Sequence, residues 1–196
     1  MERLSTENLE QALTALAAFL EEADAARETL VVICGSALIS LGLISRTTKD
    51  VDIMAGVDAE HGLVDPRPMS AALQAAAAAV SREMHLDPHW LNTGPADQVL
   101  AGLPEGFLSR LTWRDYGPAL TIYLPDRFDL IHLKLFAIMD QGRGRHSADL
   151  AALRPTEDEL LTADRWILTQ DAGEVFPQIV RTALTDIGYG HLVARL

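Results

Sequence analysis

The sequence has a single cysteine, Cys34, and no apolar run long enough to cross a membrane as a helix. One cysteine excludes an internal disulfide framework and is typical of proteins in the reducing cytoplasm, where we expect this chain to be located. Met1-Glu2-Arg3 does not resemble the start of a signal peptide. These absences predict a cytoplasmic protein that has no membrane as a partner.

Basic residues are also scarce, with 16 Lys and Arg against 28 Asp and Glu and a net charge of −12. Proteins that bind DNA or RNA broadly need clustered cations to neutralise phosphates, so the composition argues against broad DNA binding. It leaves a local basic cleft open. A chain of 196 residues with 48% hydrophobic content has enough apolar side chains for a sizeable core.

The strongest signal lies in residues 31–54, which overlap a short apolar run, Leu30–Ile33, rich in β-branched side chains. Gly35 and Ser36 break that run, and a mostly apolar stretch, 37–44, follows. The pattern predicts a buried strand, a turn and a helix. Gly35 would let the backbone approach a phosphate closely, and Ser36 would offer a hydroxyl at the N-terminus of the helix.

Two carboxylates alternate with apolar side chains in the next expected strand, Asp50-Val51-Asp52-Ile53-Met54. Residues i and i+2 of a strand share one face, so Asp50 and Asp52 should project together while Val51 and Ile53 enter the core. Adjacent carboxylates repel unless a cation lies between them or one holds a proton. Because Mg²⁺ is commonly bound by one or two carboxylates plus substrate phosphates, the stretch predicts chemistry on a nucleoside triphosphate (NTP).

Simpler interpretations of the two motifs remain open. A Gly-Ser after a strand is commonly an ordinary turn, and a lone Asp-x-Asp commonly lies on a solvated strand face. A dinucleotide-binding fingerprint needs G-x-G-x-x-G after the strand. Here Ser36, Ala37 and Leu38 follow Gly35, so the fingerprint is excluded.

Gly35-Ser36, thirteen intervening residues and Asp50-Val51-Asp52 together resemble the signature of polymerase-β-type nucleotidyltransferases. The loop Arg46-Thr47-Thr48-Lys49 is similar to the form common in bacterial AbiEii-like and related toxin-type enzymes. The resemblance implies Mg²⁺-dependent transfer of an NMP group from an NTP such as ATP to tRNA or protein, and a toxin held in check by an antitoxin protein. It assigns catalysis and metal binding to Asp50 and Asp52, and nucleotide binding to Gly35, Ser36, Arg46 and Lys49.

A second stretch, residues 128–150, carries the rest of the resemblance. Residues 128–139 predict a helix in which Lys134 lies on an otherwise apolar face, and Asp149 follows in the next expected helix. The two resemble the late active-site pair of the toxin-type enzymes. By that resemblance Lys134 would contact the triphosphate, and Asp149 would position metal, lysine or acceptor. The alternative is a buried ion pair that only joins two helices.

The chain departs from the family in a later strand, 120–124. Polymerase-β-type enzymes usually carry a third metal carboxylate there, whereas this chain has Thr121 and Tyr123. A catalytically inactive module that binds a nucleotide or a partner therefore remains the alternative function. Trp90 and Asn92 would either contact a base or ribose or be a buried indole and a turn-forming amide.

The fold that these patterns predict is α/β, a small mixed β-sheet of nucleotidyltransferase type flanked by helices, with a helical C-terminal part. We expect a single domain over 1–196, with a core at about 27–150 and a helical extension at about 151–196. Expected helices cover Glu7–Ala26, Pro68 or Ser70 to Met84, Glu157–Gln170 with a Thr156/Glu159 capping box, and Gly173–Asp186; Ala55–Arg67 is expected to be a loop.

Overall fold

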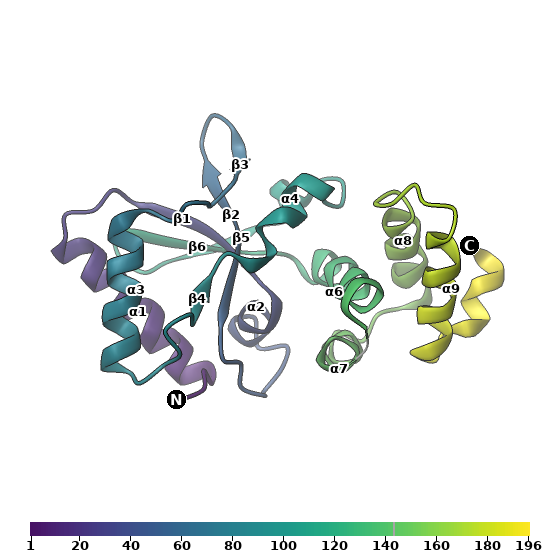
Figure 1. Cartoon of the computed structure of the whole chain (residues 1–196), viewed down its shortest axis with the longest axis horizontal. Helices are drawn as coiled ribbons and strands as arrows, with labels where there is room; N and C mark the ends of the chain where they lie inside the picture. The colour runs from purple at the N-terminus through teal and green to yellow at the C-terminus, as the bar shows by residue number, and fades with distance from the viewer. Residues whose placement is uncertain (143) are drawn as a thin grey trace. The chain divides into compact units, whose positions relative to one another are not determined.

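A computed structural model describes residues 1–142 and 144–196 of the chain. It confirms the predicted α/β fold, with a mixed six-stranded sheet flanked by helices and with helices at the C-terminus (Figure 1). The described residues form two compact units, Met1–Pro125 and Asp126–Leu196. That the whole chain is one domain with a core at about 27–150 stays a prediction.

The first unit contains the whole sheet, in the order β3-β2-β1-β6-β5, with β4 paired to β2. Its strands are β1 (Glu28–Ile33), β2 (Val51–Asp58), β3 (Gly62–Val64), β4 (Leu91–Asn92), β5 (Thr112–Asp115) and β6 (Leu120–Leu124). Its helices are α1 (Thr6–Glu22), α2 (Cys34–Ser40), α3 (Ala71–Glu83), the 3₁₀ turn η1 (Gly94–Ala96), α4 (Asp97–Ala101) and α5 (Phe107–Arg110).

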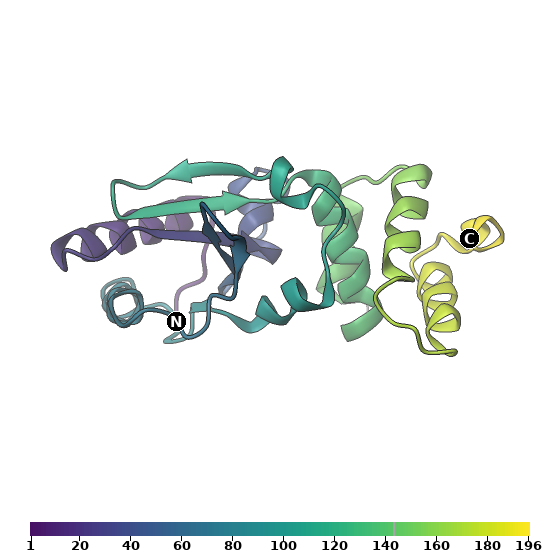
Figure 2. The ribbon, with the colours of Figure 1, turned by 90° about the horizontal axis from the view of Figure 1, so that it is seen from above.

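Strand β2 has β1 antiparallel along one edge, so β3 and β4 pair with its other edge, β3 antiparallel and β4 parallel. Strand β6 runs parallel to β1, and β5, the first strand of an antiparallel hairpin with β6, is the edge strand on that side of the sheet; both are drawn in teal in Figure 2. Because β1 and β2 are antiparallel, the C-terminal end of β1 and the N-terminal end of β2 lie next to each other at the same end of the sheet.

The predicted alternation in β2 is confirmed at its start, where Val51 and Ile53 are fully buried. It then stops, because the register passes from Val32↔Ile53 to Val31↔Ala55 and leaves Met54 as an extra residue. A bulge of this kind shifts the following side chains by one position. As a result Ile53, Met54 and Ala55 are all buried.

Capping residues set the start of the two long helices of this unit. The Ser5 hydroxyl accepts the Asn8 N–H at the start of α1, and the Ser70 hydroxyl accepts the Leu73 N–H at the start of α3. The two helices pack against each other and lie side by side in Figure 1. Both predicted helices are confirmed, although α1 ends at Glu22, four residues before the predicted end.

The prediction of a loop over 55–67 is wrong, because β2 continues to Asp58 and forms a hairpin with β3. The Asp58 carboxylate accepts the His61 backbone N–H at 2.8 Å, contacts the His61 imidazole at 2.7 Å and accepts the Glu60 N–H at 2.9 Å, and these contacts lower the pKa of Asp58. Gly62 adopts a positive φ of 75°. An Asp and a Gly at these positions favour a tight turn, and the glycines that suggested a loop belong to the hairpin.

The second unit is helical, with α6 (Arg127–Gln141), α7 (Arg145–Ala152), α8 (Glu157–Ile167), α9 (Phe176–Asp186) and the 3₁₀ turn η2 (Gly190–Arg195). Helix α6 packs against α7, α8 and α9. The predicted capping box at the start of α8 is present, with Thr156 and Glu159 bonded reciprocally. Helix α8 ends three residues before the predicted Gln170, and α9 begins three residues after the predicted Gly173.

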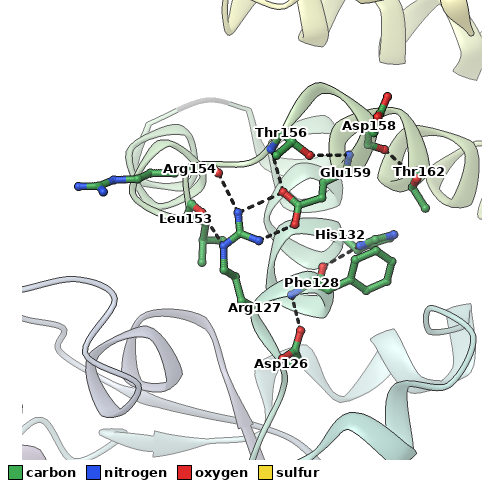
Figure 3. Close-up of polar contacts among 10 residues, drawn as sticks. All are labelled: Asp126, Arg127, Phe128, His132, Leu153, Arg154, Thr156, Asp158, Glu159 and Thr162. Atoms are coloured by element: carbon green, nitrogen blue, oxygen red, sulfur yellow. Dashed lines mark hydrogen bonds and ion pairs between the residues drawn. The ribbon is translucent and has the colours of Figure 1, made fainter.

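Arg127 ties the start of α6 to the turn between α7 and α8 (Figure 3). Its guanidinium donates to the carbonyls of Leu153 and Arg154, both at 2.8 Å, and to both carboxylate oxygens of Glu159. The guanidinium, together with the Thr156 N–H, lowers the pKa of Glu159 to about 2. A bidentate ion pair therefore fixes how α8 begins relative to α6.

Among the described residues of both units, no helix is long and apolar enough to span a membrane.

Candidate functional site

The turn between β1 and α2 is closely packed. Cys34 has a positive φ of 62°, an uncommon conformation for a residue with a side chain. A Cβ at Gly35 would lie 3.0 Å from Thr48 Oγ1 and 3.4 Å from Arg46 Nη2. The loop at residues 46–48 therefore lies directly against the Gly35 backbone, and glycine is the residue that fits there.

Ser36 lies inside the unit, with 1% of its surface exposed. Its hydroxyl donates to the Ile33 carbonyl at 3.1 Å, across the junction between strand and helix. The hydroxyl therefore stabilises the turn. Gly35 is buried as well, with the Thr48 and Arg46 side chains against it, so the contact of this turn with a phosphate stays a prediction.

Thr48 connects the turn to the first carboxylate. Its backbone N–H and carbonyl pair with those of Leu4 at 2.9 and 2.7 Å, which fixes the loop, and its side chain is buried. The Thr48 hydroxyl donates to Asp50 Oδ1 at 3.2 Å. The same hydroxyl oxygen is the atom closest to Gly35, so Asp50 is held beside the turn.

Asp52 lies opposite Ile33, the last residue of β1, in the register of β1 and β2. Its Oδ1 accepts the side-chain N–H of Asn92 on β4 at 3.2 Å. Asp50 and Asp52 are both partly exposed, and Val51 between them is buried. This is the pattern expected when two carboxylates project from the same face of a strand end.

Two cations belong to the loop that precedes the carboxylates. Arg46 is partly exposed, donates to the Thr47 carbonyl at 3.1 Å and lies against Gly35. Lys49 is exposed and directly precedes Asp50. The first unit thus contains six predicted site residues: it brings Gly35, Ser36, Arg46, Asp50 and Asp52 to the same end of the sheet, whereas Lys49 is an exposed neighbour of Asp50 in the chain.

The other two predicted site residues, Lys134 on α6 and Asp149 on α7, belong to the second unit. Lys134 Nζ lies 2.9 Å from Asp149 Oδ2, and the two side chains are 4% and 1% exposed. The predicted pairing of these residues is therefore present as a buried ion pair between two helices. Whether the pair also serves a substrate stays a prediction.

The strand β6 offers no carboxylate beside Asp52. Tyr123 is level with Val31 on β1, whereas Asp52 is level with Ile33, two residues further along β1. The Tyr123 ring packs against Trp113, with centroids 6.2 Å apart. Thr121 lies further from Asp52, where its hydroxyl donates to Asp115 and accepts from Arg27.

The described residues hold no group of three or more His, Cys, Asp or Glu side chains placed to bind a metal. Two carboxylates still fit Mg²⁺, which binds proteins through one or two carboxylates and takes its other oxygens from phosphate and water. Asp50 and Asp52 would hold the ion, and a phosphate of the substrate would supply further oxygen ligands. The donor set therefore fits a magnesium ion that is bound together with a phosphate.

Two residues of this site were missed as holders of the carboxylates. Thr48 precedes Asp50 by two positions in a polar loop, and this spacing is the signal for a side chain that contacts it. Asn92 lies 40 residues from Asp52, and only the parallel pairing of β4 with β2 brings them together. Asn92 also accepts the Gly94 N–H, and Trp90 is fully buried, as the simpler interpretation of both residues predicts.

In comparisons with protein-family models, curated proteins and solved structures, nothing matches this chain.

Proposed function

We propose that this protein is a nucleotidyltransferase that moves an NMP group from an NTP to an acceptor in tRNA or protein. One observation carries the proposal: the side chains of Arg46 and Thr48 lie against Gly35 and Thr48 holds Asp50, so that the glycine turn, a cation and the carboxylates lie close together at one end of the sheet. A pair of carboxylates preceded by cations in the same loop suits a triphosphate that arrives with its metal.

Each residue has a role in this proposal. Asp50 and Asp52 would hold Mg²⁺, and one of them would accept the proton of the acceptor hydroxyl. The acceptor oxygen forms a bond to the α-phosphorus, the bond from that phosphorus to the bridging oxygen breaks, and pyrophosphate leaves. Arg46 and Lys49 would neutralise the charge that develops on the leaving group, and the Gly35 backbone would lie against the phosphates. Bound Mg²⁺ stabilises the charge of such an in-line displacement.

The test is transfer of label from each α-³²P-labelled NTP, with Mg²⁺, to total tRNA and separately to a protein extract. We expect label transfer with at least one NTP, and a fall of about 100-fold or more in Asp50→Asn and Asp52→Asn because each loses a charge that acts on the reacting phosphate. Asp58→Asn, at the far end of the same strand, is the matched control. The proposal fails if no NTP labels either acceptor, or if Asp52→Asn transfers as well as the unchanged protein.

A module that binds a nucleotide or a partner without transferring anything is the second candidate. It is favoured by the position of β6, which places Thr121 and Tyr123 rather than an acid in the family's third-ligand strand. Such a module would bind Mg²⁺ and NTP through Asp50 and Asp52 but release no pyrophosphate. The resemblance extends the first candidate to a toxin with a cognate antitoxin protein, which co-expression of neighbouring genes would test by rescue of growth.

A further inference from the structure

Asn92 lies where a third acid would stand if β4 rather than β6 supplied it. Strand β4 pairs with β2 in parallel register, so that Asn92 is the direct neighbour of Asp52 on the edge away from β1. The Asn92 amide nitrogen is 3.2 Å from Asp52 Oδ1. A carboxylate at the same position would have an oxygen against Asp52 in place of a hydrogen-bond donor.

The surroundings of Asn92 fix both its place and its orientation. Trp90 is fully buried, and its indole N–H donates to the Ala77 carbonyl of α3 at 2.9 Å. The Val51 N–H donates to the Trp90 carbonyl at 2.5 Å, which aligns β4 with β2. The Gly94 N–H donates to Asn92 Oδ1 at 2.9 Å, so the amide nitrogen is the atom that faces Asp52.

We propose that Asn92 is a positioning residue for Asp52 and keeps a third negative charge out of the metal site, so that the divalent cation enters together with the NTP. The inference rests on the proposed function. Asn92 holds the Asp52 carboxylate by a hydrogen bond and adds no charge, which leaves two negative charges at the site. Two carboxylates attract a divalent cation less strongly than three, and the phosphates of the nucleotide supply the missing charge.

The substitution Asn92→Asp separates positioning from charge. The new carboxylate keeps an oxygen for the Gly94 N–H but loses the donor to Asp52, and it places a third negative charge beside the pair. We expect Mn²⁺, used as a probe without nucleotide, to bind Asn92→Asp about tenfold or more tighter than the unchanged protein. A third carboxylate close to the other two adds to the attraction of a divalent cation. Asn8→Asp on α1 adds the same charge elsewhere and should leave Mn²⁺ affinity unchanged.

The second variant, Asn92→Ala, removes the donor without adding charge. We expect it to weaken binding of Mg²⁺ and NTP together several-fold, with no gain in Mn²⁺ affinity. If Asn92→Asp does not fold without metal, the readout becomes refolding on addition of Mn²⁺, which repulsion among three carboxylates predicts and a merely broken turn does not.

Isothermal calorimetry of Mn²⁺ alone and of Mg²⁺ with each NTP tests the proposed function and the role of Asn92 separately. Should the unchanged protein bind no Mg²⁺–NTP, the proposed function fails. Should it bind Mg²⁺–NTP while Asn92→Asp binds Mn²⁺ no better than the unchanged protein, the function stands and the role of Asn92 is overturned. Equal Mg²⁺–NTP affinity of Asn92→Ala and the unchanged protein also overturns it.

Discussion

Asp164 is a buried carboxylic acid on α8, with none of its surface exposed. Neither carboxylate oxygen has a hydrogen-bond partner within residues 1–142 and 144–196. The charged residues at the start of the same helix are engaged elsewhere, Glu157 with His191 and Arg195, and Glu159 with Arg127. Burial raises the pKa of Asp164 to about 7 because the charged form loses its hydration.

The raised pKa predicts a loss of stability as pH rises. The folded chain holds a proton on Asp164 that the unfolded chain releases near its ordinary pKa of 3.8. Its stabilising effect is therefore complete below pH 3.8 and is lost as pH rises through about 7. Over that window the unfolding free energy should fall by about 4 kcal/mol from this group, and Asp164→Asn should abolish the fall.

The measurement is urea unfolding followed by far-UV circular dichroism between pH 4 and pH 8. The difference in unfolding free energy between Asp164→Asn and the unchanged protein should grow with pH in favour of the variant. Asp158→Asn, whose side chain is 89% exposed on the same helix, should show no such trend. A difference that stays constant with pH for Asp164→Asn would contradict the assigned burial of a protonated acid.

The spacing of apolar residues in the sequence predicts that Asp164 is buried but not that it has no hydrogen-bond partner among the described residues. Asp164 follows Leu160 by four positions and precedes Ile167 by three, and both are fully buried, so the helical period places it on the apolar face. Spacing predicts which face a residue occupies. It does not predict whether a partner reaches that face from another helix, because this depends on how the helices pack.

At the scale of elements, the sequence predicted the start of a capped helix better than it predicted which strands pair. The Thr156/Glu159 capping box predicted where α8 begins, since a cap contacts residues two or three positions away. The pairing of β4 with β2 joins Asp52 to a residue 40 positions away, and no local pattern marks it, whereas the Asp58 and Gly62 signal of the β2–β3 hairpin was interpreted as a loop. The sequence therefore predicted both site carboxylates but neither Thr48 nor Asn92 as the residues that hold them.

The Lys134–Asp149 ion pair joins α6 and α7, and its two interpretations, a structural contact and an active-site pair, predict different results. Removing one partner leaves a buried charge without its counterion, so Lys134→Met and Asp149→Leu should each lower stability by about 3–5 kcal/mol. The double variant, which leaves no buried charge at this position, should recover most of that loss. Thermal unfolding of the single and double variants measures both effects.

Transfer activity of the stable double variant then decides between the two interpretations of the pair. The resemblance to toxin-type enzymes predicts that transfer is lost although the fold is retained. Transfer at the level of the unchanged protein would instead mean that the pair only joins α6 and α7. Arg165→Met, at an exposed site on α8, is the control for loss of a cation from the second unit.

For the whole molecule, the feature that matters is a short segment with both cations and carboxylates in an acidic chain. The net charge of −12 opposes broad attraction of polyanions, yet Arg46 and Lys49 belong to the loop that leads into Asp50 and Asp52. A triphosphate without its metal would meet two carboxylates as well as two cations. We therefore expect nucleotide binding to need a divalent ion, which relieves repulsion between the carboxylates and the phosphates.

The most direct test of the account is isothermal calorimetry of each NTP with and without Mg²⁺, on the unchanged protein and on Asp52→Asn. We predict binding of at least one NTP in the presence of Mg²⁺, little binding without it, and loss of the Mg²⁺-dependent binding in Asp52→Asn although its thermal unfolding is retained. If no NTP binds in the presence of Mg²⁺, or if Asp52→Asn binds as the unchanged protein does, the two carboxylates are not a nucleotide site and the proposed function is contradicted.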